Sequence, residues 1–307
     1  MTDKTRRSKA KDKIVEKQHA AKQAVYDKTP DRFKNATSLQ VRFRTGAIYV
    51  GLSVLCVLLG DIPTMVYLSA ISAMCAGEFY YMMRVDARLP NEAIGIVGAA
   101  CFPIAMWYRG LPGVAVVAVL LVIALLVWFV YYMRARVPDV GVSFFGAAYT
   151  GMLLSSLILV RQSLESPWGG VLVLLLFCSV WFNDAGAYLA GSMFGKHKLA
   201  PRTSPKKTWE GLIFGLVVSA AIWCLMTLVP GVDMSIPKAI VFGLLCGVSG
   251  VVGDLAESRI KRNVGVKDSG TIMPGHGGLL DRCDSMFLAS VVATVFLIGG
   301  GCIPYVG

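Results

Sequence analysis

Long apolar stretches alternate with short polar stretches from residue 46 to the end of the chain. An α-helix needs about 20 mostly apolar residues to cross a bilayer, and most of these stretches approach or exceed that length, although the first and third are shorter. They lie at about 46–60, 62–83, 93–108, 111–133, 141–160, 168–194, 211–229, 239–256 and 285–306. The pattern therefore predicts an all-α, polytopic integral membrane protein with about nine transmembrane helices.

The composition agrees with this prediction. Of the 307 residues, 55% are hydrophobic and 16% are charged, whereas soluble domains carry about 25% charged residues. The net charge of +11 would also suit a nucleic-acid-binding protein, but no basic stripe is interleaved with aromatic residues, so no nucleic-acid partner is predicted. The eight cysteines include no C-x-x-C pair. We expect them to be packing residues rather than disulfide or zinc ligands.

The distribution of positive charge predicts the orientation in the membrane. With nine helices, every Lys and Arg except Arg109, Arg161 and Lys238 falls in the N-terminal tail or in loops on the same side as that tail. Because positively charged loops stay in the cytoplasm, we expect a cytoplasmic N-terminus and an external C-terminus. Residues 1–45 contain thirteen Lys or Arg and no apolar run, and we predict that they form a disordered cytoplasmic tail.

Charged and glycine residues are concentrated between residues 254 and 284. If the beginning of this stretch is helical, Asp254, Glu257 and Lys261 lie on one face, and Asp281 and Asp284 share a face at the start of the last apolar segment. Glycines follow His276, so the backbone there can approach a ligand closely. Mg²⁺ binds one or two carboxylates together with substrate phosphates, and cations hold the remaining phosphate charge. This stretch is therefore a candidate metal–polyphosphate site.

A second candidate stretch covers residues 183–211. Asp184 lies deep in an apolar segment, where a carboxylate is a functional candidate. Lys206 and Lys207 precede a helix whose N-terminus can face a phosphate, although the two lysines alone would equally suit a cytoplasmic anchor. Glu78 is another acid inside an apolar segment. It is expected either to pair with a lysine or arginine from the C-terminal half or to reach the membrane interface.

These two stretches resemble the phosphatidate cytidylyltransferases, the CDP-diacylglycerol synthases. The run from Ser258 to Asp284 reads S-x-I-K-R-x4-K-D-x-G-x3-P-x-H-G-G-L-x-D-R-x-D, which is similar to the signature of that family. Met273 and Cys283 depart from it, at positions where a branched apolar residue, Phe or, at the second, Thr is usual. The run S-P-K-K-T-x-E-G, which begins at Ser204, also recurs in the family. The resemblance covers roughly residues 180–290.

The resemblance implies an enzyme that transfers CMP from CTP to phosphatidic acid and forms CDP-diacylglycerol and pyrophosphate. It further implies Mg²⁺ as cofactor, with two divalent ions, and a homodimer in the inner membrane of a bacterial cell with its site facing the cytoplasm. The chemistry agrees, because a lipid phosphate is already a nucleophile. Catalysis then requires positioning and charge neutralisation rather than a strong base.

The expected site residues follow from these patterns together. Metal ligands are expected among four carboxylates, namely Asp254, Asp281, Asp284 and Asp184. The expected catalytic residues are Asp254, Asp281, Lys261, Lys267 and Asp284. The expected substrate-binding residues are Ser204, Lys206, Lys207, Thr208, Arg262, His276, Gly277, Gly278 and Arg282. We divide the chain into the tail, the N-terminal helices 46–165, and a catalytic region 166–307 with cytoplasmic loops 195–210 and 257–284.

Two other classes of function remain as alternatives. Another CTP-dependent lipid enzyme, such as a polyprenol kinase or an ether-lipid cytidylyltransferase, could use similar loops. A transporter would also place acids in the membrane. The transporter is disfavoured because no inverted repeat is apparent and the polar residues gather at one face rather than at the midplane.

Overall fold

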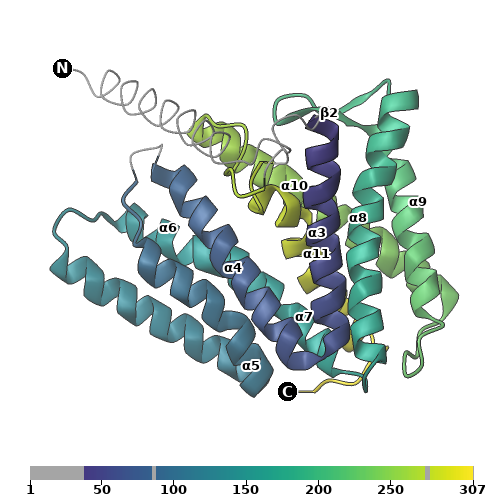
Figure 1. Ribbon diagram of the computed structural model, residues 1–307, viewed down its shortest axis with the longest axis horizontal. Helices are drawn as coiled ribbons and strands as arrows, with labels where there is room; N and C mark the ends of the chain where they lie inside the picture. The colour runs from purple at the N-terminus through teal and green to yellow at the C-terminus, as the bar shows by residue number, and fades with distance from the viewer. Residues whose placement is uncertain (1–37, 85–87, 274–276, 307) are drawn as a thin grey trace.

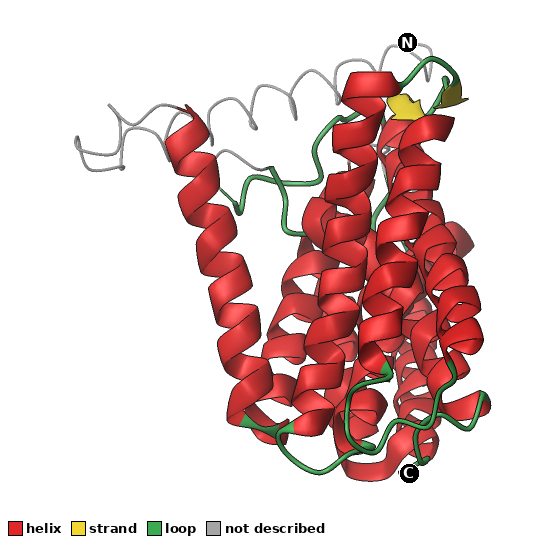
Figure 2. Ribbon diagram, turned by 90° about the vertical axis from the view of Figure 1, so that its right-hand side faces the viewer, coloured by secondary structure: helices red, strands yellow, loops and turns green. Residues whose placement is uncertain are grey.

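A computed structural model describes residues 38–84, 88–273 and 277–306. The predicted basic tail as far as residue 37, and His276, lie outside the described residues. The structure is a bundle of helices with one small β-hairpin at one end (Figure 2). The elements are α3 (Ser38–Leu59), α4 (Asp61–Met83), α5 (Glu92–Tyr131), α6 (Val137–Ala147), the π-helical turn η2 (Ala148–Met152), α7 (Leu153–Gln162), α8 (Trp168–Phe194), β1 (Lys198–Ala200), β2 (Ser204–Thr208), α9 (Trp209–Met226), α10 (Ile236–Val264) and α11 (Leu280–Gly299).

The helices have the length and surface of membrane-spanning segments. Among the described residues, seven helical runs are long and apolar enough to cross a membrane, and the apolar part of α3, Phe43–Leu59, is shorter. Large apolar side chains are exposed along them; Val119 and Leu120, for example, are each 58% exposed. Lipid tails tolerate such exposure because they are as apolar as the side chains. The protein is therefore a helical, polytopic integral membrane protein, as predicted.

The third and fourth predicted segments lie together in α5. Gly110 interrupts this helix with φ 57° and ψ −145°, a conformation that glycine adopts without steric cost. A Cβ atom added at Gly98 would lie 2.9 Å from Leu121 Cδ1. The two arms of α5 on either side of Gly110 therefore pack against each other as a helical hairpin (Figure 1). This is why nine predicted segments correspond to fewer separate long helices.

The loop predicted at 195–210 contains a β-hairpin, which the pattern of apolar and polar residues does not predict. β1 and β2 pair in antiparallel orientation, with Lys198 opposite Thr208. The hairpin is fixed to the start of α9, because the backbone N–H of Trp209 donates to the His197 carbonyl at 3.0 Å. Glu210 also accepts from the His197 backbone N–H at 3.2 Å. The hairpin and the described C-terminal residues lie at opposite ends of the bundle (Figure 2).

Candidate active site

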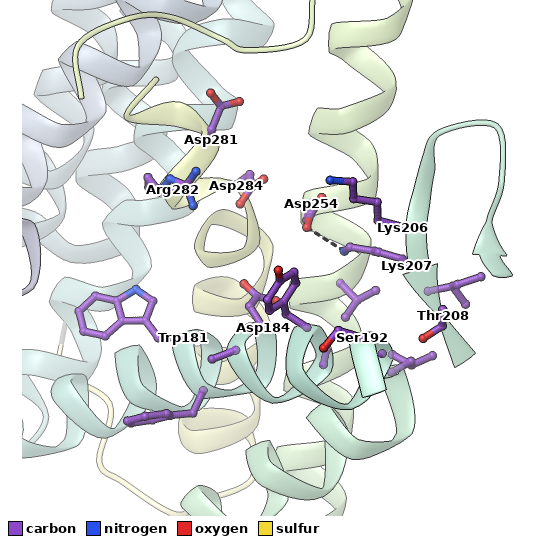
Figure 3. A pocket seen from close by; sticks show the side chains of 18 of the residues that line it. Trp181, Asp184, Ser192, Lys206, Lys207, Thr208, Asp254, Asp281, Arg282 and Asp284 are labelled. Carbon is purple, nitrogen blue, oxygen red and sulfur yellow. Dashed lines mark ion pairs between the residues drawn. The ribbon is translucent and has the colours of Figure 1, made fainter. Parts of the chain in front are cut away.

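A cavity of about 900 Å³ lies where α3, α8, the hairpin, α10 and α11 meet. Its volume is within the range of small-molecule sites, which is about 300–1,000 Å³. The cavity brings the two candidate stretches of the sequence together (Figure 3). Its charged and hydroxyl-bearing lining residues include Asp184, Ser192, Lys198, Lys206, Lys207, Thr208, Asp254, Asp281, Arg282 and Asp284.

Three carboxylates from three different helices surround the cavity: Asp184 of α8, Asp254 of α10 and Asp284 of α11 (Figure 3). The approach of α10 to α11 depends on Gly253, where a Cβ atom would lie 2.6 Å from the Asp284 carbonyl oxygen. Asp284 is only 8% exposed, and its Oδ1 accepts from the Ser285 backbone N–H at 2.7 Å. Like charges gathered in a poorly solvated space repel each other. The arrangement therefore favours a bound cation.

The hairpin adds positive charge opposite these carboxylates. Lys207 Nζ forms an ion pair with Asp254 Oδ2 at 2.8 Å, and Lys206 also lines the cavity (Figure 3). Thr208 follows directly and caps α9, because its Oγ1 accepts from the Gly211 backbone N–H at 3.2 Å. The cap fixes the end of β2, so the two lysines enter the cavity from a defined position.

A buried charged triad lies beside the cavity. Lys261 Nζ is 2.5 Å from Glu257 Oε2 and 2.6 Å from Asp281 Oδ1. The exposed fractions of the three side chains are 11% for Lys261, 0% for Glu257 and 9% for Asp281. Lys261 and Glu257 lie one turn apart on α10, on the face predicted from their spacing. In this structure the lysine is thus bound to protein carboxylates, and it is not among the residues that line the cavity.

Asp281 differs from the other cavity carboxylates in the number of described protein donors that contact it, which is three. Besides Lys261, its Oδ2 accepts from the backbone N–H groups of Ser269 at 3.0 Å and Gly278 at 2.9 Å. A carboxylate has about four acceptor positions, so little capacity remains on Asp281 for a metal ion. Its contacts instead tie the segment between α10 and α11 to the first turn of α11.

The remaining predicted site residues are distributed unevenly. Arg282 lines the cavity. Arg262 and Lys267 are exposed, and Arg262 Nη1 donates to the Val266 carbonyl at 3.3 Å, close to the end of α10. Ser204, Arg262, Lys267, Gly277 and Gly278 do not line the cavity, and His276 lies outside the described residues. Their predicted roles remain predictions.

Several lining residues were not foreseen. Trp181, Tyr188 and Ser192 lie on α8 at helical spacings from Asp184, so the periodicity of that helix could have identified them. Lys198 lies on β1, and Tyr49 belongs to α3. No sequence signal connects Tyr49 to the C-terminal half, because the contact joins distant parts of the chain.

Glu78 on α4 also contacts the site, in a way that neither sequence-based explanation anticipated. It is 5% exposed, so it does not reach the membrane interface. Its Oε2 accepts from the Leu280 backbone N–H at 2.8 Å and from Ser269 Oγ at 3.3 Å. The partners that the described residues supply to this carboxylate oxygen are thus a backbone amide and a hydroxyl.

The expected magnesium site can be compared with these donors. Within residues 38–84, 88–273 and 277–306, no three His, Cys, Asp or Glu side chains form a ready-made metal cluster. Mg²⁺, however, usually binds one or two carboxylates and completes its shell with substrate phosphates and water. The carboxylates of Asp184, Asp254 and Asp284 around one cavity fit a Mg²⁺–triphosphate complex of that kind.

Comparison with known proteins identifies similar chains. The model of the "Cytidylyltransferase family" matches residues 40–298. Phosphatidate cytidylyltransferase 4, chloroplastic, from Arabidopsis thaliana is 33% identical over 298 residues, which cover 87% of this chain and 75% of the relative. Phosphatidate cytidylyltransferases from Brucella suis biovar 1 (strain 1330) and Staphylococcus aureus (strain COL) are 41% and 45% identical. The Brucella match covers 49% of this chain and 55% of the relative, and the Staphylococcus match covers 41% of this chain and 48% of the relative.

Proposed function

Because the chain belongs to the cytidylyltransferase family, we propose that it is a membrane nucleotidyltransferase that transfers CMP from CTP to phosphatidic acid. The products are CDP-diacylglycerol and pyrophosphate, as phospholipid synthesis requires. The observation that carries the proposal is the meeting of carboxylates from α8, α10 and α11 with the lysines of the hairpin in one cavity (Figure 3). Such a set of charges suits a nucleoside triphosphate.

In the proposed reaction, an oxygen of the phosphatidic acid phosphate attacks the α-phosphorus of CTP. A new P–O bond forms there as the bond from the α-phosphorus to the β-phosphate oxygen breaks, and pyrophosphate leaves with that electron pair. Lys206, Lys207 and Arg282 neutralise triphosphate and lipid-phosphate charge, which lowers the repulsion between the two anions. No general base is needed, because the lipid phosphate is ionised at neutral pH.

The metal-binding part of the proposal assigns Mg²⁺, as one or two ions, to Asp184, Asp254 and Asp284. When bound, Mg²⁺ withdraws charge from the phosphates of the nucleotide. Lys207 then exchanges its ion pair with Asp254 for contact with a phosphate. Asp281, an expected ligand, acts in this proposal by holding the segment before α11 in place, because protein donors satisfy its oxygens.

The proposed setting is the inner membrane of a bacterial cell, with the N-terminus and the cavity on the cytoplasmic side and the C-terminus outside. Counting α3 and both arms of α5 gives nine crossings. The charge distribution supports this arrangement, as does the placement of the hairpin and the C-terminal residues at opposite ends of the bundle (Figure 2). CTP is available in the cytoplasm, and phosphatidic acid is available in the surrounding bilayer.

The proposal is tested with purified protein in mixed micelles of detergent and phosphatidic acid. With CTP and Mg²⁺, equal amounts of CDP-diacylglycerol and pyrophosphate should appear, and Asp254→Asn should slow the formation of both at least about a hundredfold. Appearance of neither product with the wild-type protein would refute the proposed activity. Activity with an ether-linked phosphatidic acid but not with a diacyl one would favour the ether-lipid alternative.

A further inference from the structure

Glu78 connects an N-terminal helix to the segment that precedes α11. It lies on α4, which contributes no residue to the cavity lining. Its Oε2 nevertheless accepts from the backbone N–H of Leu280, the first residue of α11, at 2.8 Å. The first amides of a helix have no acceptor within the helix, and negative charge at that end is stabilising. Glu78 therefore supplies from another helix the acceptor that α11 lacks.

The segment is shaped to receive this carboxylate. A Cβ atom added at Gly270 would collide with the carboxyl group of Glu78. One added at Gly278 would lie 2.6 Å from Glu78 Oε2 and would also collide with Ser269 Oγ. Real side chains do not tolerate such distances, so these two glycines leave the space that Glu78 occupies.

The same segment is also hydrogen-bonded to a residue that lines the cavity. Ser269 donates its backbone N–H to Asp281 at 3.0 Å and its hydroxyl to Glu78 at 3.3 Å. Asp281, Arg282 and Asp284 follow Leu280 in the first turn and a half of α11, and all three line the cavity. A shift of Leu280 would therefore move three cavity side chains together.

We infer that Glu78 is a positioning residue for the reaction: through Leu280 and Ser269 it holds the first turn of α11 in the orientation that the cavity requires. The inference rests on the proposed function for its effect on turnover. Its structural part, the attachment of Ser269 and Leu280 to Glu78 on α4, stands on the hydrogen bonds alone and can be measured without any activity.

The first test compares Glu78→Leu with Glu78→Gln in the full-length protein. Leucine removes the acceptor, whereas glutamine keeps a carbonyl oxygen that can accept from Leu280. Glu78→Leu should lower kcat at least about tenfold and Glu78→Gln at most about threefold, with KM for CTP changed less than about threefold in both. Hydrogen exchange of peptides covering residues 266–284 should rise in Glu78→Leu and stay near wild type in Glu78→Gln.

A matched control is Ser72→Ala. Ser72 is buried on the same helix, and the structure gives its hydroxyl no hydrogen-bond partner among the described residues. Both kcat and exchange in 266–284 should stay at the wild-type level. A similar rise in exchange in Ser72→Ala and Glu78→Leu would overturn the inference, because any disturbance of α4 would then suffice.

A second test works from the loop and does not depend on how well Glu78→Leu folds. Gly270→Ala should lower kcat about tenfold in the wild-type background, because its Cβ displaces the Glu78 carboxyl group. In the Glu78→Ala background, Gly270→Ala should lower kcat by less than about a further twofold, because the space of the Glu78 carboxyl group is then free. If the reduction of kcat in the double variant equals the product of the reductions in Gly270→Ala and Glu78→Ala, the inference is overturned. A wild-type protein without CMP transfer would refute the proposed function alone, and hydrogen exchange would still decide the role of Glu78.

Discussion

Lys261 offers the sharpest test of how the site is held together. Its ammonium lies 2.5 Å from Glu257 Oε2 and 2.6 Å from Asp281 Oδ1, and the three side chains are between 0% and 11% exposed. Lys261→Met keeps most of the volume of the aliphatic stem and removes the ammonium group, and with it the charge and the hydrogen-bond donors. Two nearly buried carboxylates would then face each other without a cation.

The size of the effect follows from that burial. Removing one partner of a buried ion pair destabilises a protein by about 3–5 kcal/mol, mainly because a charge is left uncompensated. For a chain of this size, such a loss corresponds to a fall in melting temperature of at least about 6 °C. The double variant Lys261→Met/Glu257→Met removes one of the stranded carboxylates and should regain at least about half of the loss.

The melting temperature of each variant is measured in detergent by tryptophan fluorescence during heating. All variants are scanned at one rate because membrane proteins often unfold irreversibly. Lys267→Met is the matched control, since Lys267 is an exposed lysine in the same part of the chain and its loss should leave the melting temperature unchanged. Equal melting temperatures for Lys261→Met and Lys267→Met would refute the reasoning. A double variant less stable than Lys261→Met would refute it as well.

Other expectations follow from the same geometry. Asp254→Asn should lower the maximal rate at least about a hundredfold, or about 2.7 kcal/mol of barrier, and raise the Mg²⁺ concentration for half-maximal rate, whereas the exposed Asp233→Asn should match wild type in both. Cysteines introduced at position 200 and at the exposed position 272 should react with impermeant reagents from the cytoplasm, and those at 165 and 235 from outside; labelling of 200 and 272 from opposite sides would exclude a shared site. Glu210→Gln should raise KM for CTP a few-fold at unchanged melting temperature. The reason is that His197 Nδ1 lies 2.6 Å from Glu210 Oε1 and the pair anchors the hairpin. An unchanged KM would mean that the hairpin needs no such anchor.

The apolar segments and the two charged stretches were predictable because both depend on local sequence. Every predicted segment lies on a helix, and Asp184, Asp254 and Asp284 lie around one cavity as their motifs suggested. Periodicity shows which face of a helix a residue occupies, but not which side chain meets it there. Asp281 illustrates the limit. Its motif predicts a metal ligand, and it lines the cavity, but its contacts with Lys261, Ser269 and Gly278 could not be predicted because they depend on tertiary structure.

Three features could not be predicted, because they depend on contacts between distant residues or on segments with no distinct sequence pattern. Glu78 and Leu280 are separated by 202 positions, so no motif joins them. The fold-back of α5 depends on the backbone conformation of Gly110, which looks like any other glycine in an apolar run. The β-hairpin consists of strands of three and five residues, too short for an alternating pattern to emerge.

The fate of the individual phosphates of CTP tests the central claim most directly. Purified protein, Mg²⁺ and phosphatidic acid are incubated in parallel with CTP labelled at the α-phosphate and with CTP labelled at the γ-phosphate. Transfer of CMP predicts that the α-label moves into the lipid fraction and that the γ-label is released as pyrophosphate. Recovery of the γ-label in the lipid fraction, with phosphatidic acid or with a polyprenol in its place, would show a kinase and contradict the account.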